Sequence, residues 1–124
     1  MAHTTKGYDM IKGVHHLAII SSSEECVNFY VGLGFEEYFR KERGYDTIVL
    51  LKGYGIQMEM FIDPRHPDRD MDPERIGLRH LALQVDSCED IIQKYKCGPI
   101  KQDWLGINYC CTEDPDGLTI EFHE

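Results

Sequence analysis

Short segments in which apolar and polar side chains alternate recur along the chain and predict β-strands. In Ile56–Ile62 the apolar Met58 and Met60 alternate with Gln57 and Glu59. Side chains two residues apart share one face of a strand, so this segment has an apolar face and a polar face. The apolar face is expected to pack under a helix, and the polar face is expected to line a concave surface where a site can lie.

The same patterns place the other elements. Seven further strands are expected at Val14–Ile20, Phe35–Arg40, Thr47–Leu51, His80–Val85, Gly98–Lys101, Ile107–Thr112 and Leu118–His123. A first helix should follow the capping serines Ser21–Ser23 and end near Gly32 and Gly34. A second helix should be capped by Asp86 or Ser87. Strand-rich halves with one helix each predict an α+β fold whose sheets curl around a cavity, with the helices outside.

The second half of the chain repeats the first. Gly13–Ile19 reappears as Gly77–Leu83, and Ile56–Phe61 reappears as Leu118–His123. Each half therefore has the order β-α-β-β-β. The chain is interpreted as one domain, residues 1–124, built from a first module (13–62), a connector (63–76) and a second module (77–124).

The connector Asp63–Ile76 contains three prolines and is not expected to form a regular helix or strand throughout. Connectors of this length are uncommon unless they are functional or flexible. Arg65, Arg69 and Arg75 could hold an anionic substrate, or the segment could close as a lid. A solvated loop with internal ion pairs is the favoured alternative.

Composition narrows the class of protein. A length of 124 residues and 42% apolar content suit one globular domain with a real core. The net charge of −9 argues against nucleic acid or an anionic membrane as a partner. No apolar stretch approaches the ~20 residues that span a bilayer, and Met1–Lys12 lacks the apolar core of a signal peptide. A cytoplasmic location is therefore expected.

The five cysteines are expected to be reduced and mostly buried. Their number is odd and no C-x-x-C motif occurs, so neither a disulfide framework nor a zinc ribbon is indicated. Cys110 and Cys111 are neighbours on a predicted strand and should point to opposite faces.

One histidine and one glutamate recur at matching places in the two modules. His16 corresponds to His80, and Glu59 corresponds to Glu121. If the modules pack about a pseudo-two-fold axis, the four side chains converge on one point. Two imidazoles and two carboxylates form a ligand set for a divalent metal ion. A purely structural polar cluster is the alternative.

Two other histidines lie close to the predicted ligands. His15 precedes His16 and points to the opposite face, and its counterpart in the second module is Arg79, so His15 is interpreted as a packed or rim residue. His123 shares a face with Glu121 and could form a pocket wall, or it could be solvated.

A His₂Glu₂ set leaves two adjacent positions free on a six-coordinate ion. These positions can chelate a substrate that carries neighbouring oxygens, and the metal then works as a Lewis acid. One of the two glutamates could act as the general base. By the symmetry of the repeat, Glu59 and Glu121 are both candidates.

At this point the chain resembles the vicinal oxygen chelate superfamily, and within it the glyoxalase I-like proteins. The resemblance covers Val14 to Glu124. It is carried by His16-Leu17-Ala18, Phe29-Tyr30, Leu33-Gly34-Phe35, Gln57-Met58-Glu59-Met60-Phe61, Gly77-Leu78-Arg79-His80-Leu81-Ala82, Asp114-Pro115-Asp116-Gly117 and Ile120-Glu121.

The resemblance implies two tandem βαβββ modules forming a cupped, partly closed eight-stranded mixed sheet with helices outside. It implies His16, Glu59, His80 and Glu121 as ligands of one nickel, cobalt, zinc or manganese ion. The implied activity is that of a lactoylglutathione lyase-like enzyme. Such an enzyme isomerises the hemithioacetal of methylglyoxal and glutathione to S-lactoylglutathione, and a glutamate moves the C1 proton. A small-molecule substrate and a homodimer are expected as partners.

The chain departs from well-studied glyoxalase I enzymes on the first strand. Those enzymes carry an arginine there that helps to hold glutathione, whereas this chain has Ile19-Ile20-Ser21. The co-substrate could therefore be a thiol other than glutathione, or the substrate could be another molecule with adjacent oxygens. Alternatives within the superfamily are an epimerase, a thiol transferase or a dioxygenase, and a non-catalytic small-molecule binding module. Glu59 counts against an epimerase and a dioxygenase, and the presence of all four ligands counts against the binding module.

Overall fold

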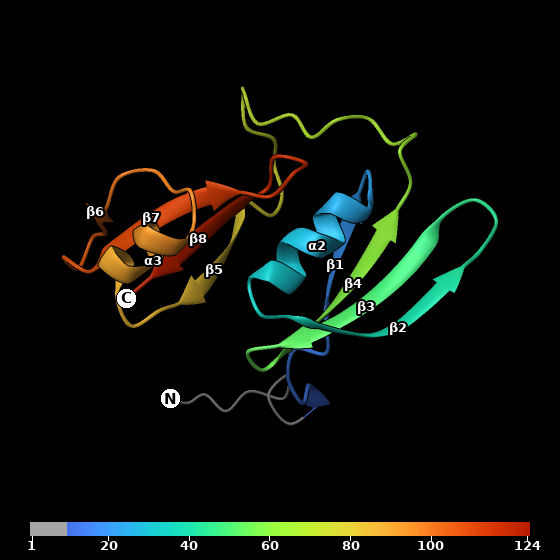
Figure 1. Ribbon diagram of the computed structural model, residues 1–124, viewed down its shortest axis with the longest axis horizontal. Coiled ribbons are helices and arrows are strands. Elements are labelled where there is room, and N and C mark those ends of the chain that lie inside the picture. The colour runs from blue at the N-terminus through green and yellow to red at the C-terminus, as the bar shows by residue number, and fades with distance from the viewer. Residues whose placement is uncertain (1–9) are drawn as a thin grey trace. The chain divides into compact units, whose positions relative to one another are not determined.

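A computed structural model describes residues 10–124, so most of Met1–Lys12 lies outside the described residues. The chain divides into two compact units, Met1–His66 and Pro67–Glu124 (Figure 1). The longer of the two main helices in the described part has 9 residues, and no helix there is long and apolar enough to cross a lipid bilayer.

The first unit is a four-stranded sheet with one helix. Its elements are β1 (Leu17–Ser21), α2 (Glu24–Gly32), β2 (Glu36–Glu42), β3 (Thr47–Gly53) and β4 (Ile56–Ile62). The strand order is β1-β4-β3-β2, with β1 parallel to β4 and the other pairs antiparallel. The helix α2 lies across one face of this sheet (Figure 1).

The second unit repeats this arrangement. Its elements are β5 (His80–Gln84), α3 (Cys88–Lys94), β6 (Lys101–Gln102), β7 (Asn108–Glu113) and β8 (Thr119–His123). The strand order is β5-β8-β7-β6, with β5 parallel to β8. The predicted α+β fold of two βαβββ modules is confirmed, and the eight predicted strands form two mixed sheets of four.

Two strands begin three residues later than predicted. β1 begins at Leu17 rather than Val14, and just before it the Gln57 side-chain amide donates to the His15 carbonyl. β6 is limited to Lys101–Gln102, because the preceding Pro99 has no N–H to donate to a ladder.

The cores form where the predicted alternation places apolar side chains. Met58 and Met60 on β4, and Ile120 and Phe122 on β8, are buried, as expected from their spacing. Glu59 and Glu121 lie on the opposite faces of these strands, which are only partly buried. The first core is larger than the second. Buried apolar residues are Ile19, Cys26, Val27, Tyr30, Leu33, Phe35, Val49, Leu51, Met58, Met60 and Ile62 in the first unit, and Cys88, Cys110, Leu118, Ile120 and Phe122 in the second.

The helix starts follow the capping prediction. The Ser23 hydroxyl accepts from the backbone N–H of Glu25, and the Ser87 hydroxyl accepts from that of Asp90. Ser87, and not Asp86, is therefore the cap of α3. Acidic residues in the first turn of each helix favour the same start, because the N-terminal end carries partial positive charge.

Gly34 links α2 to β2 in a conformation that favours glycine. Its φ is +112°, and a Cβ there would overlap the Tyr54 hydroxyl. That hydroxyl donates to the Leu33 carbonyl and so joins the end of α2 to the β3–β4 turn. The exit from the helix therefore depends on the absence of a side chain at position 34.

The connector residues, all of which the structure describes, form neither helix nor strand. Arg65 pairs with Asp63, and Arg75 pairs with Asp70. Beyond the connector, Arg79 pairs with Glu74. These local ion pairs favour the interpretation of the connector as a solvated, self-paired loop.

Candidate functional site

The first unit brings His16 and Glu59 together. His16 immediately precedes β1, and Glu59 on β4 lies opposite Ala18, two residues further along β1. Because Ala18 has a small side chain, the imidazole and the carboxylate can approach across it. The distance from His16 Nε2 to Glu59 Oε1 is 3.4 Å, and the two side chains are 43% and 28% exposed.

The second unit builds the same pair from the repeated residues. Glu121 on β8 lies opposite Ala82, two residues beyond His80 on β5. The distance from His80 Nε2 to Glu121 Oε1 is 3.5 Å, and the side chains are 28% and 16% exposed. The two pairs therefore agree in strand register, in the intervening alanine and in the atoms that face each other.

These separations fit two ligands of one metal ion. A charged N–H···O bond is normally about 2.7–2.9 Å long, which is shorter than either distance. Two donor atoms each about 2.1 Å from one ion lie roughly 3.0–3.4 Å apart at octahedral or tetrahedral angles. The 3.4 Å of the first pair lies at the upper end of this range and the 3.5 Å of the second lies just above it. Imidazole with carboxylate is a donor set that divalent transition metals accept.

Each unit supplies two of the four predicted ligands, and the structure describes each unit by itself. Within residues 10–124, no group of three or more His, Cys, Asp or Glu side chains is gathered for metal binding. The assignment of His16, Glu59, His80 and Glu121 to one ion therefore stays a prediction.

His15 contacts the predicted ligand beside it. Its Nδ1 lies 2.9 Å from His16 Nδ1, and the two rings meet edge to face. When the proton lies on His16 Nδ1, that nitrogen donates to His15, and His16 Nε2 keeps its lone pair toward Glu59. Such a partner fixes the tautomer and orientation of a ligating histidine. His15 is therefore a candidate for orienting His16, a role that its expected place on the opposite face did not indicate.

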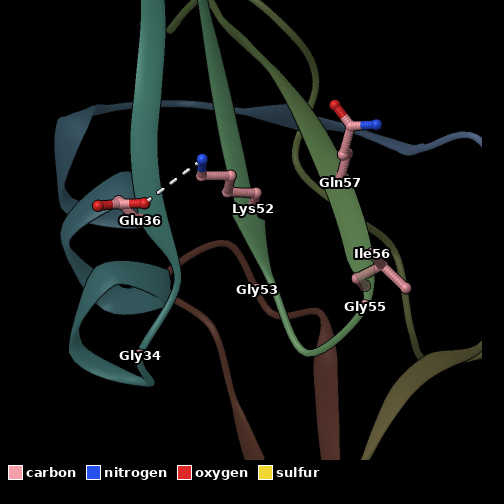
Figure 2. A pocket seen from close by; sticks show the side chains of 7 residues that line it. All are labelled: Gly34, Glu36, Lys52, Gly53, Gly55, Ile56 and Gln57. Atoms are coloured by element: carbon pink, nitrogen blue, oxygen red, sulfur yellow. Dashed lines mark ion pairs between the residues drawn. The ribbon is translucent and has the colours of Figure 1, made fainter.

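Near Glu59, polar side chains extend the face toward the β3–β4 turn. The Tyr38 hydroxyl donates to Gln57 Oε1 at 2.5 Å, and the Lys52 ammonium lies 5.5 Å from the centroid of the Tyr38 ring. Lys52 also pairs with Glu36 at 3.7 Å (Figure 2). A shallow depression lies here, lined by these charged side chains, Gln57 and the glycines of the turn (Figure 2).

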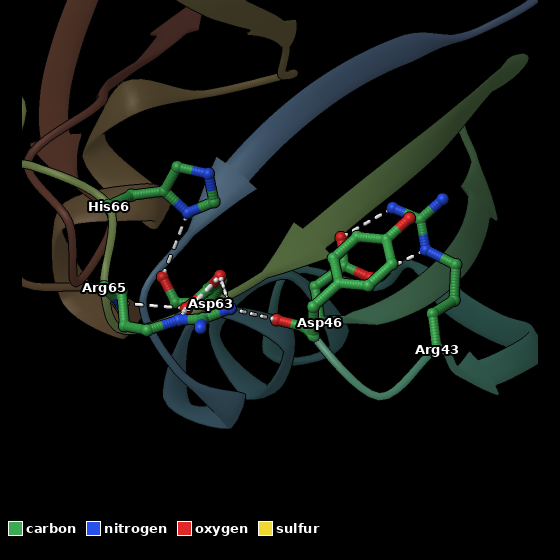
Figure 3. A network of polar contacts seen from close by, with 6 residues as sticks. Arg43, Asp46, Asp63, Arg65 and His66 are labelled. Carbon is green, nitrogen blue, oxygen red and sulfur yellow. Dashed lines mark hydrogen bonds and ion pairs between the residues drawn. The ribbon is translucent and has the colours of Figure 1, made fainter.

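A network of ion pairs lies where β4 ends (Figure 3). Asp63 accepts from the side chain and the backbone N–H of Arg65, which together hold the pKa of this carboxyl well below its usual range. His66 bonds to the Asp63 carbonyl through Nδ1 at 3.1 Å. In the neighbouring turn, Arg43 pairs with Asp46 at 2.6 Å.

In the second unit, His123 is held by two neighbours. Its Nε2 lies 2.8 Å from Asp103 Oδ2, and its ring stacks on Tyr109 with centroids 6.3 Å apart. Backbone N–H groups of Ile107 and Leu105, together with His123, lower the pKa of Asp103. These two contacts argue against a freely solvated His123 side chain.

Cys111 lies opposite Glu121 in the β7–β8 ladder and shares its face. Burial and the nearby charge of Glu121 raise the pKa of this thiol, while Lys101 and Arg79 oppose the rise. Cys110 is buried in the core whereas Cys111 is partly exposed, which confirms that the two neighbours point to opposite faces. The same parity rule could have placed Cys111 beside Glu121, but the strand pairing was needed to bring the two residues together.

Comparisons with known proteins agree with this fold. No protein-family model matches the chain. The chain is 37% identical to the uncharacterized protein YwkD of Bacillus subtilis, over 93% of this chain and 98% of YwkD. A crystal structure of a glyoxalase family protein from Enterococcus faecalis superposes with a TM-score of 0.85 at 37% identity, covering 93% of this chain and 99% of that one.

The chain therefore belongs to the glyoxalase family of the vicinal oxygen chelate superfamily. A lactoylglutathione lyase from Agrobacterium tumefaciens also superposes, with a TM-score of 0.66, over 91% of this chain and 93% of that one. Its identity to this chain is 18%, so it shows the shared fold alone.

Proposed function

We propose that the protein is a metal-dependent lyase or isomerase of the glyoxalase I type. The observation that carries this proposal is the recurrence of one His–Glu pair, with the same register and nearly the same separation, in both units. Each pair joins an imidazole and a carboxylate on a partly exposed face. The two pairs together supply the two nitrogen and two oxygen donors of one ligand set.

In this proposal His16, Glu59, His80 and Glu121 hold one divalent ion, which is nickel, cobalt, zinc or manganese. When bound, the ion supplies Lewis-acid polarisation of adjacent substrate oxygens. The histidines bind through Nε2, and His15 keeps the proton of His16 on Nδ1. The homodimer expected from the sequence also stays a prediction.

The proton transfer is assigned to one of the glutamates. Glu121 is the less exposed of the two, at 16% against 28% for Glu59. A carboxylate that is shielded from water is a better base toward a carbon acid, because less solvent must be removed from it. Glu121 is therefore proposed to serve both as a ligand and as the group that moves the proton between the neighbouring carbons, whereas Glu59 serves as a ligand alone.

The candidate substrate is the hemithioacetal of methylglyoxal and glutathione. The test uses metal-stripped protein reloaded separately with nickel, cobalt, zinc and manganese. Bound metal is measured by elemental analysis, and S-lactoylglutathione formation is followed by ultraviolet absorbance. Glu121→Gln is the control, because it keeps the shape of the side chain and removes the base.

Activity with at least one metal that is lost in Glu121→Gln supports the proposal in full. One bound metal per site without activity would exclude this hemithioacetal and leave another substrate with adjacent oxygens. A protein that binds none of the four metals would exclude the metalloenzyme and favour a non-catalytic binding module.

A further inference from the structure

Arg43 lies in the turn between β2 and β3 and is held in a fixed orientation. Its Nε and Nη2 donate to the two carboxylate oxygens of Asp46, at 2.7 and 2.6 Å (Figure 3). The Asp46 side chain is only 7% exposed. The backbone closes the same turn, because the Arg43 N–H donates to the Asp46 carbonyl at 2.9 Å. A bidentate pair on a carboxylate that is largely shielded from water fixes the plane of the guanidinium.

Aromatic rings place this guanidinium on the face that carries Glu59. The guanidinium carbon lies 4.7 Å from the centroid of the Tyr45 ring and 5.6 Å from that of Phe61. Phe61 follows Glu59 by two residues on β4, so the two side chains share a face. The hydrogen bond to Asp46 is the main cause that raises the pKa of Arg43, and the charge of Glu59 adds to it.

The guanidinium keeps a second set of donors. Arginine has five N–H groups, and the bonds to Asp46 take one from Nε and one from Nη2. Of the remaining three, one on Nη1 and one on Nη2 lie along the Nη1–Nη2 edge, which forms another fork for an oxyanion. Within residues 10–124, Arg43 forms no hydrogen bond beyond the pair with Asp46. A purely structural ion pair would need only the edge already used.

Other arginines of the same unit use more of their N–H groups in hydrogen bonds. Arg40, on the same hairpin, uses all three of its nitrogens in bonds to Glu24 and Glu37. Arg65 donates to Asp63 and to the Tyr45 carbonyl. The first strand, which carries an arginine in well-studied glyoxalase I enzymes, has none here.

We propose that Arg43 binds an oxyanion group, a carboxylate or a phosphate, of the substrate whose adjacent oxygens occupy the metal site. The inference rests on the proposed function and narrows it to anionic substrates. Because Asp46 already balances the charge of the guanidinium, recognition comes from the geometry of the fork. A lysine at position 43 would supply charge without that geometry and should not replace it.

The test uses zinc-loaded protein and hydroxamic acids, which chelate zinc through two adjacent oxygens. Acetohydroxamic acid is compared by calorimetry with hydroxamic acids that carry a carboxylate or phosphonate on a chain of two to five methylenes. In the wild type, at least one anionic member should bind roughly ten- to a hundredfold tighter than acetohydroxamic acid, the range expected for hydrogen bonds to a charged group.

The variants are Arg43→Gln, Arg43→Lys and the matched control Arg40→Gln. The preference for the anionic tail should disappear in both Arg43 variants and persist in Arg40→Gln. The affinity for acetohydroxamic acid should stay unchanged in all three variants. An unchanged affinity would show that the fold and the metal site are intact. No preference in the wild type, or a preference that survives in Arg43→Gln, would overturn the inference. Failure of the wild type to bind zinc or any hydroxamate would instead overturn the proposed function, and the inference with it.

Discussion

The His80 imidazole and the Glu121 carboxylate, which come from β5 and β8, lie 3.5 Å apart across Ala82. The register of one parallel ladder is enough to create this pair. The same register in the first unit creates the pair of His16 and Glu59. Duplication of one small module thus supplies two half-sites without any further change of backbone.

Replacing His16 with alanine should weaken the affinity for zinc by more than about a hundredfold, because it removes a ligand. The loss of a residue that only orients a ligand typically lowers metal affinity by about 10- to 100-fold. His15→Ala should fall in that lower range, since His15 contacts His16 without facing Glu59. Competition with a chromophoric chelator measures both affinities. Equal losses in the two variants would contradict the assignment of His16, and not His15, as the ligand.

A large side chain at position 82 should disturb zinc binding if His80 and Glu121 are metal ligands. A leucine there would occupy the space between His80 and Glu121 and should weaken zinc binding. Because the position is exposed, the free energy of unfolding of this variant should stay within about 0.5 kcal/mol of the wild-type value. Gln84→Leu is the matched control, because it lies on the same face opposite His123. Chelator competition and urea unfolding separate the two effects, and undiminished zinc affinity in Ala82→Leu would argue against this site.

Asp63 should contribute to stability in a pH-dependent way. Its pKa is lowered in the folded state by Arg65, so its stabilising effect is present above the unfolded value near 3.9 and is lost as the pH falls below it. Asp63→Asn should lower the urea midpoint at pH 7, and the difference from the wild type should shrink as the pH falls below about 4. Asp68→Asn, an exposed connector change, serves as control. A constant difference across the pH range would show that Asp63 does not act through its charge.

Gly34→Ala should destabilise the first unit by more than about 1 kcal/mol, the usual scale for a left-handed non-glycine residue. Gly44→Ala is matched, because its φ of +91° carries similar backbone strain but a Cβ there meets nothing within 4 Å. Tyr54→Phe should relieve part of the cost of Gly34→Ala, since it removes the atom that the new Cβ overlaps. Urea unfolding of the four variants measures this, and strictly additive effects would exclude the overlap.

Thiol labelling should divide the cysteines into two groups. Cys26, Cys88 and Cys110 are buried, and burial raises the pKa of Cys88 to about 12, so these three should react only after unfolding. Cys97 and Cys111 are partly exposed and should react in the native protein. Bound zinc should slow the labelling of Cys111, which shares the face of Glu121. Native labelling of Cys110 before Cys111 would contradict the predicted strand faces.

Strand parity and the internal repeat predicted much of this structure from local information. Alternation along β4 and β8 placed Met58 and Ile120 in the cores and Glu59 and Glu121 on the opposite faces. Boundaries were less predictable, since β1 begins at Leu17 rather than at Val14 and β6 at Lys101 rather than at Gly98. The bounds of a strand depend on its pairing with residues that are distant in the sequence. The ligand role of the four residues is supported by this geometry and stays a prediction.

The sequence by itself determined the fold class, the order of elements in each half and the identity of the repeated His and Glu residues. These features depend on spacing along the chain, which the sequence states directly. Only the tertiary structure decided that Ala18 and Ala82 separate the paired side chains, that His15 contacts His16, and that Arg43 lies over Phe61. Such contacts depend on strand register and on the path of a turn, because residues distant in sequence become neighbours only when the sheet forms.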